Sequence, residues 1–214
     1  MSLENLEIID GEAVKENLKP EEVDVLVEAF IESTSRKVDL TVLETHEAVQ
    51  EALDRKGRAD ALTRHIYEVI DEGDMVIARV DGKIAGMISG YLFTYRYHPD
   101  PENEHFVEVP VIEMGKGRVL DSFQDNGIYS KMRAKLFSNL KVKHPNAMIL
   151  AATKDTKIKT LCSKNPELEE ISFERYLRIH NDPEPLVQAK LPKMLKGGWT
   201  AFLHIPAALK QKLE

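Results

Sequence analysis

Two kinds of apolar spacing divide the chain: helical spacing dominates its first third, and strand-like runs follow. Between residues 20 and 31, apolar side chains recur at the three- to four-residue spacing of an amphipathic helix. Pro20 followed by acidic residues is typical of a helix start. A second stretch of helical spacing covers residues 41–69, and we expect a break near Gly57, since glycine weakens a helix. A weak alternation over residues 6–9 predicts a first strand.

Two apolar runs then meet at Asp81-Gly82. Residues 75–80 precede this dipeptide, and residues 83–93 follow it. Asp-Gly between two strand-like runs is the strongest short-range signal for a β-hairpin that a sequence offers. The pattern therefore predicts two antiparallel strands joined at residues 81 and 82.

After the hairpin, strand-like and helical segments alternate. Residues 97–104 form a predicted polar loop. Further strands are expected at residues 106–112, 118–123, 147–152 and 199–205, and helices directly after Gly127 and at residues 157–163. This order predicts a mixed α/β (α+β) fold. A length of 214 residues favours a single domain over residues 1–214, with residues 180–214 as a C-terminal strand and extension.

Charge and cysteine content narrow the function classes. The net charge is −7, so the chain lacks the basic field of a general binder of nucleic acids or anionic membranes. Cys162 is the only cysteine, which excludes an intrachain disulfide and a cysteine-rich zinc site. The N-terminus has no signal-peptide pattern, and no run approaches the about 18 apolar residues of a spanning helix. These features predict a cytoplasmic protein.

The segment Gln124–Tyr129 carries the most informative chemistry. It connects a predicted strand to a helix that begins directly after Gly127. The first N–H groups of a helix have no partner inside it, and the helix dipole adds positive charge there, so such a joint can bind an anion such as pyrophosphate. Gly127 would let a phosphate approach the backbone closely. The same residues would also serve an ordinary strand–helix joint, and no Walker pattern or dinucleotide fingerprint is present.

The order of predicted elements resembles the GNAT acetyltransferase superfamily over roughly residues 5–175. That family has an acetyl-CoA loop of the pattern Q/R-x-x-G-x-G/A. Gln124 and Gly127 match its first and fourth positions, whereas Tyr129 stands at the sixth in place of a small residue. The resemblance implies a GNAT-like, largely antiparallel central sheet flanked by helices. It also implies acetyl-CoA as cosubstrate, held by Arg118, Val119, Gln124, Asp125, Asn126, Gly127, Ile128 and Tyr129.

The resemblance further implies an N-acetyltransferase that moves acetyl directly to a primary amine of a small molecule or protein. Two alternatives stay open: a degenerate domain of this fold that binds CoA or a partner without catalysis, and a structural or oligomerising α/β protein with an accidental motif. Lys131, Arg133 and Lys135 follow the loop. They would either add positive charge for the cosubstrate or form a solvated helix face.

Acyl transfer to an amine needs a base that takes the amine's proton. The resemblance implies Glu113 for this role, because it lies eleven residues before Gln124. Glu108 and Asp121 are the substitutes. The structural alternative for Glu113 is an exposed strand residue beside the glycines at 115 and 117, where a bulge would change the face to which it points.

An acid is needed for the leaving thiolate. Cys162 stands on the predicted short helix where the family often has a tyrosine, and a thiol can donate a proton to a thiolate of similar pKa. Tyr176 and Ser163 are the other candidates. A lone cysteine is also commonly a small buried apolar residue, so both interpretations of Cys162 stay open.

Two further clusters bear on partners. The loop after the hairpin contains His98, Asp100, Glu102, Glu104 and His105. Such groups can bind a metal, but their alternation with proline and asparagine favours an acidic loop that forms one wall of a pocket for a cationic amine, so we expect no metal. Lys190, Lys193 and Lys196 lie among apolar residues, which indicates an amphipathic surface or a homodimer contact.

Overall fold

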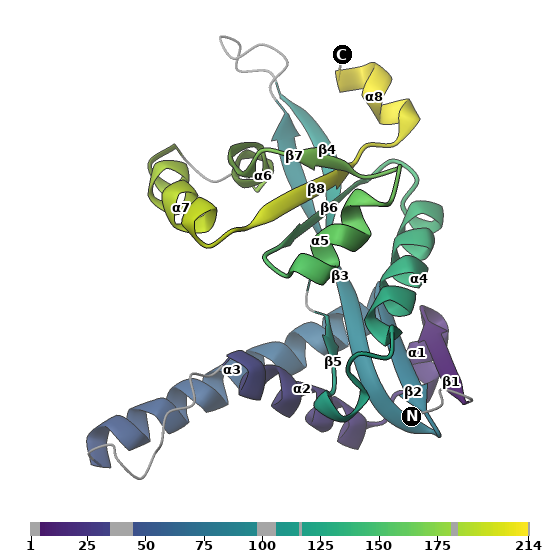
Figure 1. Ribbon diagram of the computed structural model, residues 1–214, viewed down its shortest axis with the longest axis vertical. Helices are drawn as coiled ribbons and strands as arrows, with labels where there is room; N and C mark the ends of the chain where they lie inside the picture. The colour runs from purple at the N-terminus through teal and green to yellow at the C-terminus, as the bar shows by residue number, and fades with distance from the viewer. Residues whose placement is uncertain (1–4, 35–44, 98–105, 116, 181–183, 214) are drawn as a thin grey trace. The chain divides into compact units, whose positions relative to one another are not determined.

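A computed structural model describes residues 5–34, 45–97, 106–115, 117–180 and 184–213. Its elements are β1 (Leu6–Asp10), α1 (Glu12–Asn17), α2 (Pro20–Thr34), α3 (Thr45–Asp71), β2 (Met75–Val80), β3 (Lys83–Tyr97), β4 (Val107–Met114), β5 (Arg118–Val119), a 3-10 helix η1 (Asp121–Phe123), α4 (Ile128–Lys143), β6 (Met148–Thr153), α5 (Thr156–Ser163), β7 (Glu169–Ile171), α6 (Phe173–Ile179), α7 (Glu184–Lys196), β8 (Thr200–His204) and α8 (Ala207–Leu213) (Figure 1). Contacts divide the chain into two compact units. The first is Met1–Ser89 with Lys116–Leu136, and the second is Gly90–Gly115 with Phe137–Glu214.

The eight strands of the described residues follow the order β1-β2-β3-β4-β6-β8-β7, with β5 paired to β3. The pairing of β4 with β6 is parallel, and the other described pairings are antiparallel. The predicted mixed, largely antiparallel sheet flanked by helices is therefore confirmed. Strand β3 and helix α4 each contribute residues to both units.

The hairpin of the first unit is formed as the sequence predicts. Strands β2 and β3 pair antiparallel, with Val80 opposite Lys83. Asp81 and Gly82 have φ angles of 51° and 73°. Positive φ at both central residues is what a two-residue type I′ turn requires, and aspartate and glycine are among the residues that tolerate it.

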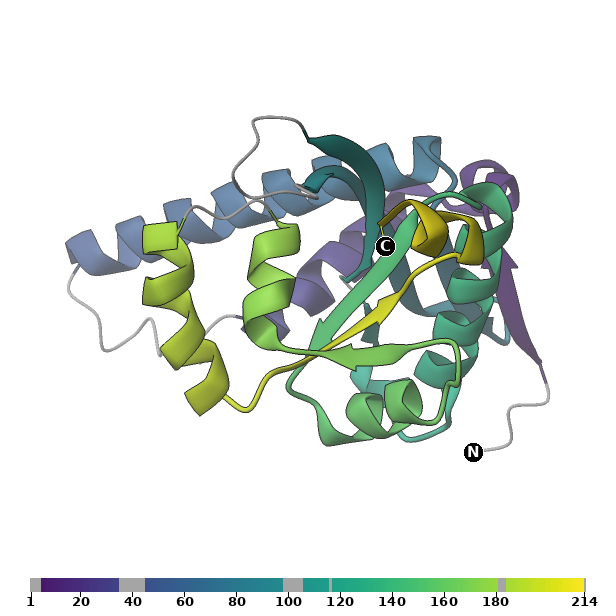
Figure 2. The same ribbon diagram turned by 90° about the horizontal axis from the view of Figure 1, so that it is seen from above.

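Helices α2 and α3 lie side by side in the first unit (Figures 1 and 2). Their buried side chains, among them Leu26 and Ile66, pack with Ile77 and Met87 of the sheet. The predicted break near Gly57 is wrong, because α3 runs through that residue. One glycine inside a helix costs only about 1 kcal/mol, which the packing of a long amphipathic helix outweighs.

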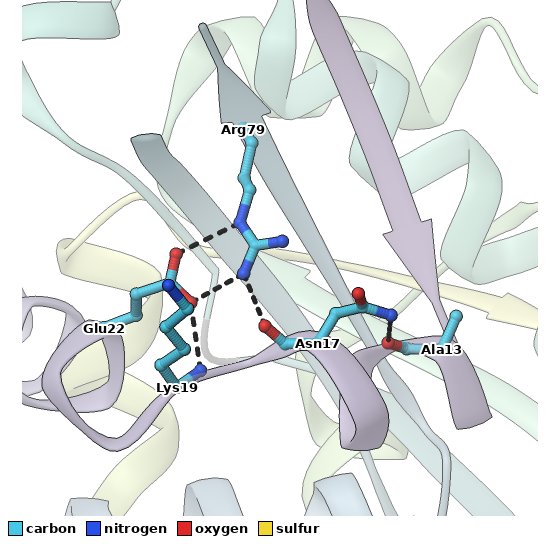
Figure 3. Close-up of polar contacts among 5 residues, drawn as sticks. All are labelled: Ala13, Asn17, Lys19, Glu22 and Arg79. Atoms are coloured by element: carbon cyan, nitrogen blue, oxygen red, sulfur yellow. Dashed lines mark hydrogen bonds and ion pairs between the residues drawn. The ribbon is translucent and has the colours of Figure 1, made fainter. Parts of the chain in front are cut away.

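A polar network joins β2 to the segment that links α1 and α2 (Figure 3). Arg79 donates from Nε to Glu22 Oε1 at 3.1 Å and from Nη2 to Glu22 Oε2 at 2.6 Å. The same Nη2 also donates to the Asn17 carbonyl at 2.7 Å, and the Lys19 N–H donates to Glu22 Oε2 at 3.0 Å. Asn17 Nδ2 in turn donates to the Ala13 carbonyl at 2.7 Å. Every formal charge of the pair is therefore met by a partner.

In the second unit, one face of the sheet is apolar. Phe93 on β3 lies opposite Val111 on β4, which lies beside Met148 on β6, so alternate residues of each strand share this face. Helices α6 and α7, which lie side by side (Figure 2), cover the face with buried residues such as Leu177 and Val187. This core positions α6 over the strand end that carries Glu113.

Several elements differ from the prediction. The strand expected at residues 118–123 is only two residues long in β5 and is followed by η1. Elements α1, β7 and α6 were not predicted, because segments of three to seven residues are too short to show a periodicity. The predicted polar loop begins later than expected, since β3 continues through Tyr97; residues 98–105 and the predicted helix start at 41–44 lie outside the described residues. Across the described part of the chain, no helix is both long and apolar enough to span a membrane.

Candidate active site

The joint between β5 and α4 lies in the first unit and contains the predicted cosubstrate loop. Asp125 and Gly127 have φ angles of 62° and 70°, so both residues have a left-handed backbone conformation just before α4 begins at Ile128. The Gly127 carbonyl accepts the N–H of Lys131 at 3.2 Å and closes the first helical turn. The N–H groups of that first turn have no acceptor within the helix, which is the arrangement that binds anions.

Side chains of the loop bind mainly to one another. The Asp121 carboxylate accepts hydrogen bonds from Arg118 Nη2 at 2.6 Å and from Gln124 Nε2 at 2.5 Å. Asn126 Nδ2 donates to the carbonyls of Gln124 at 3.0 Å and Phe123 at 3.3 Å. These bonds fix the loop's shape. The buried Nε of Arg118 has no hydrogen-bond partner in the structure, so it and the backbone N–H groups at the start of α4 are the remaining donors.

Tyr129 departs from the GNAT loop pattern, and its ring packs on the strand side of the loop. A Cβ added at Gly117 would lie 2.8 Å from the ring's Cε2 and 3.0 Å from Ile88. The ring thus occupies space that glycine at position 117 leaves open. Ile128, the first residue of α4, is buried in the core.

The three cations after the loop have different surroundings. Lys131 is exposed, and Lys135 forms an ion pair with Asp10 at 3.0 Å. Arg133 is only 8% exposed, and its buried Nη2 has no hydrogen-bond partner in the structure. The solvated helix face considered for all three therefore does not describe Arg133.

In the second unit, Glu113 is held at the end of β4. Its neighbours across the sheet are Tyr91 on β3 and Leu150 on β6. The Tyr176 hydroxyl on α6 donates to Glu113 Oε1 at 2.6 Å. Nε2 of His180 lies 3.7 Å from Glu113 Oε2, and both side chains are 25% exposed. A carboxylate, a phenol and an imidazole therefore meet on the otherwise apolar face.

Aromatic rings hold the histidine in place. The His180 ring stacks on Phe93 with centroids 4.6 Å apart and an interplanar angle of 17°. Its centroid lies 4.7 Å from that of Tyr176, which precedes it by four residues. Its buried Nε2 makes no hydrogen bond in the structure, because the 3.7 Å separation from Glu113 Oε2 is longer than a hydrogen bond. His180 did not emerge from the sequence; the i, i+4 spacing to Tyr176 would have indicated it only once α6 was known.

The other candidates are dispersed. Cys162 is fully buried on α5, while Ser163 is exposed. Glu108 is exposed and pairs with Arg96 at 3.8 Å, and Asp121 belongs to the loop network. The cluster of His98, Asp100, Glu102, Glu104 and His105 lies outside the described residues. Within the described ranges, no group of three or more histidine, cysteine or acidic residues is placed to hold a metal ion.

The ladder between β4 and β6 stops at Glu113. Glu113 opposite Leu150 is its last pair, whereas β6 continues to Thr153. Residues 151–153 of β6 pair with β8 on their other side. Their backbone edge toward β4 has no strand partner among the described residues, and such an edge can bind an extended chain through its N–H and C=O groups.

Comparisons with known proteins agree with this architecture at the level of fold. No protein-family model matches the chain, and no curated protein matches it. Among solved structures, the chain is similar to a GCN5-related N-acetyltransferase from Kribbella flavida, with a TM-score of 0.51 and 12% identity over 78% of this chain and 33% of that one.

Two further structures have lower TM-scores. N-acetylglutamate synthase from Neisseria gonorrhoeae, complexed with coenzyme A and N-acetyl-glutamate, has a TM-score of 0.47 and 12% identity over 94% of this chain and 35% of that one. Arabidopsis thaliana Naa50, in complex with the bisubstrate analogue CoA-Ac-MVNAL, has a TM-score of 0.43 and 10% identity over 92% and 95%. The chain spans about a third of the length of the Kribbella and Neisseria structures. The protein has the fold of the GCN5-related N-acetyltransferases, the GNAT fold.

Proposed function

We propose that the protein is an acetyl-CoA-dependent N-acetyltransferase that transfers acetyl directly to a primary amine of a small molecule or protein. The observation that carries the proposal is the 2.6 Å hydrogen bond from Tyr176 to Glu113 on the apolar face of the second unit. Most neighbours of Glu113 on this face are apolar or aromatic, so a partly exposed carboxylate in this position indicates a functional role more than a contribution to stability. The GNAT fold supports this class of reaction.

Acetyl-CoA is the proposed cosubstrate. Backbone N–H groups at the start of α4 suit its pyrophosphate, and Arg118, Val119, Gln124, Asp125, Asn126, Gly127, Ile128 and Tyr129 form the proposed binding segment. The proposal includes no metal.

Glu113 and Tyr176 can together move the proton that the reaction releases. Glu113 takes a proton from the attacking amine, as the new C–N bond forms and the C–S bond breaks. Tyr176 gives its proton to the leaving sulfur and is restored by the proton held on Glu113. The sum transfers one proton from the amine to the thiol. Cys162 remains the alternative acid, although its burial separates it from solvent.

A cationic amine suits the surroundings of Glu113. Tyr91, directly across the sheet, is 53% exposed, and its ring stacks with Phe93 at a centroid distance of 6.2 Å. Aromatic faces beside a carboxylate attract an ammonium group by cation–π and ion-pair contacts. We therefore expect the acceptor to approach as an ammonium ion, to lose one proton to solvent, and to attack as the neutral amine whose second proton passes to Glu113.

The test has a binding arm and a turnover arm. We expect acetyl-CoA and CoA to raise the melting temperature, since both bind the folded state. Release of free thiol with a panel of primary amines measures turnover, and Glu113→Gln should lower kcat by about 10²- to 10⁴-fold. Glu108→Gln, an exposed change on the same strand, is the matched control and should retain activity.

Two more variants identify the acid. Tyr176→Phe should lower kcat, whereas Cys162→Ala should leave it unchanged if Tyr176 supplies the proton. The reverse result would assign the role to Cys162. Binding of acetyl-CoA without thiol release for any amine would favour a degenerate domain, and no binding would refute the cosubstrate assignment.

A further inference from the structure

A cavity of the second unit has a lining that does not include Glu113. Its volume is about 300 Å³, within the range of pockets for small ligands. The apolar lining comes from Met148 on β6, Ile179 on α6 and Ile205 after β8. Tyr95 and Tyr97 on β3 add two phenol groups. The lining is therefore suited to a small apolar body with a polar end.

Three charged residues complete the cavity. Arg175 on α6, Lys210 on α8 and Glu169 on β7 are all exposed, while Met148 and Ile179 are buried. The apolar part of the cavity is thus its interior, and the charges lie at its mouth. Two cations and one anion in this place offer partners for both a carboxylate and an ammonium group.

The phenol of Tyr95 is a hydrogen-bond donor at neutral pH. Burial raises its pKa above the ordinary value of 10.0, and the neighbouring phenol of Tyr97 raises it further. The positive charges of Arg175 and Arg178 act in the opposite direction, and the net shift is upward. A protonated phenol can therefore donate to a ligand carboxylate beside the Arg175 guanidinium.

This cavity is separate from the proposed acetyl-transfer site. Glu113 lies opposite Tyr91, whereas Tyr95 lies four residues further along β3. Four strand residues span about 13 Å, which is too far for one small ligand to reach both ends. The stacked rings of Phe93 and His180 stand on the same face between these positions.

We propose that the cavity binds a free α-amino acid with an apolar side chain. Its carboxylate pairs with Arg175 and Lys210 and accepts from Tyr95, and its ammonium group pairs with Glu169. Its side chain fills the space lined by Met148, Ile179 and Ile205. The binding step does not depend on acetyl transfer, so it is tested with no cosubstrate present.

Calorimetry with three probes of similar shape tests each charge. L-leucine has both charges, 4-methylpentanoate has only the carboxylate, and 3-methylbutylamine has only the ammonium group. We expect L-leucine to bind most tightly, 4-methylpentanoate to bind more weakly and the amine not to bind. Glu169→Gln should bring the affinities of L-leucine and 4-methylpentanoate together.

Variants of α6 supply a matched comparison. Arg175→Met should weaken L-leucine binding by about tenfold or more, which is the loss of one charge-assisted contact. Arg178→Met removes the same charge from the same helix, but Arg178 pairs with Glu174 and is not among the residues that line the cavity. The affinity of this variant for L-leucine should therefore stay close to that of the unchanged protein. Equal effects of the two substitutions would overturn the proposal. So would equal binding of leucine and 4-methylpentanoate, or no binding of leucine at about 10 mM.

Discussion

Replacing Arg79 by methionine removes a guanidinium that serves two acceptor groups in the first unit. Its Nε and Nη2 atoms donate to the Glu22 carboxylate, and Nη2 also donates to the Asn17 carbonyl. The side chains of Arg79 and Glu22 are only 12% and 14% exposed. Methionine keeps much of the apolar stem of arginine, so the change isolates the loss of the charged head.

The magnitude follows from this partial burial. A hydrogen bond to a charged group contributes about 1.5–3 kcal/mol, and breaking a fully buried ion pair costs about 3–5 kcal/mol. Because Glu22 keeps the Lys19 N–H and some solvent, we expect Arg79→Met to lower the free energy of unfolding by about 2–4 kcal/mol. In a double-mutant cycle with Glu22→Gln, the coupling free energy should be about 1–3 kcal/mol.

The pair should also make stability depend on pH. Burial alone raises the pKa of Glu22, but hydrogen bonds from Arg79 and the Lys19 N–H, with the Arg79 charge, bring it below its ordinary value of 4.5. Since the folded-state pKa is the lower one, the contribution is fully present above the unfolded value and disappears as the pH falls through the folded value. The stability difference between the unchanged protein and Glu22→Gln should therefore shrink under acidic conditions.

Urea unfolding at neutral and acidic pH measures these quantities, provided that the m-value stays constant among the variants. The control is Arg178→Met in the exposed pair with Glu174, where both side chains are about half exposed. Such surface pairs contribute about 0–1 kcal/mol, so the control should have little effect. A coupling below about 0.5 kcal/mol between Arg79 and Glu22 would show that the pair behaves like a surface pair, and the reasoning from burial would then be refuted.

Two glycine-to-alanine substitutions should change the free energy of unfolding in opposite directions, and loss of one helix N-cap should lower it. Gly57→Ala should raise the free energy of unfolding by about 0.5–1 kcal/mol, since Gly57 lies inside α3 with nothing near its missing Cβ. Gly86→Ala should lower it by about 1–3 kcal/mol or more, because a Cβ there would lie 2.5 Å from the Arg118 carbonyl oxygen. Asp155→Ala should cost about 0.5–2 kcal/mol by removing the acceptor for the N–H groups of Lys157 and Ile158. Urea unfolding measures all three changes. If Gly57→Ala and Gly86→Ala changed the free energy of unfolding in the same direction, the packing argument would be contradicted.

Elements bounded by characteristic turn or helix-start residues could be predicted from the sequence. Short elements, and elements that depend on tertiary packing, could not. Asp81-Gly82 set a turn whose φ angles only a few residues tolerate, and Pro20 set a helix start, so both predictions are confirmed. The expected break at Gly57 failed because a local preference of about 1 kcal/mol is small beside the burial of a long helix. Helix α6 and strand β7 depend on packing against the sheet, which leaves little periodic signal in so few residues.

The same distinction applies to the candidate site. The spacing to Gln124 indicates Glu113 only through the resemblance to the GNAT family, and the catalytic role of Glu113 stays a prediction. Its contacts with Tyr176 and His180 arise because α6 docks over the end of the β4–β6 ladder. Strand register and helix docking are tertiary properties, since a shift of one residue would turn Glu113 to the opposite face. A sequence pattern therefore proposes Glu113 but has no means to pair it with residues 63 and 67 positions away.

The departure of the loop from the GNAT pattern concerns charge more than space. Tyr129 stands where the pattern has a small residue, yet its ring lies against Gly117 and Ile88, and any Cβ at position 117 would collide with it. Glycine at 117 and tyrosine at 129 therefore accommodate each other, and the ring need not occupy the place of a phosphate. Asp125 is a different matter, because it is exposed in the loop with a φ angle of 62° and would repel a pyrophosphate that approached its carboxylate. Under the proposed function, the affinity of the loop for acetyl-CoA depends on how far the backbone N–H groups at the start of α4 offset the negative charge of Asp125.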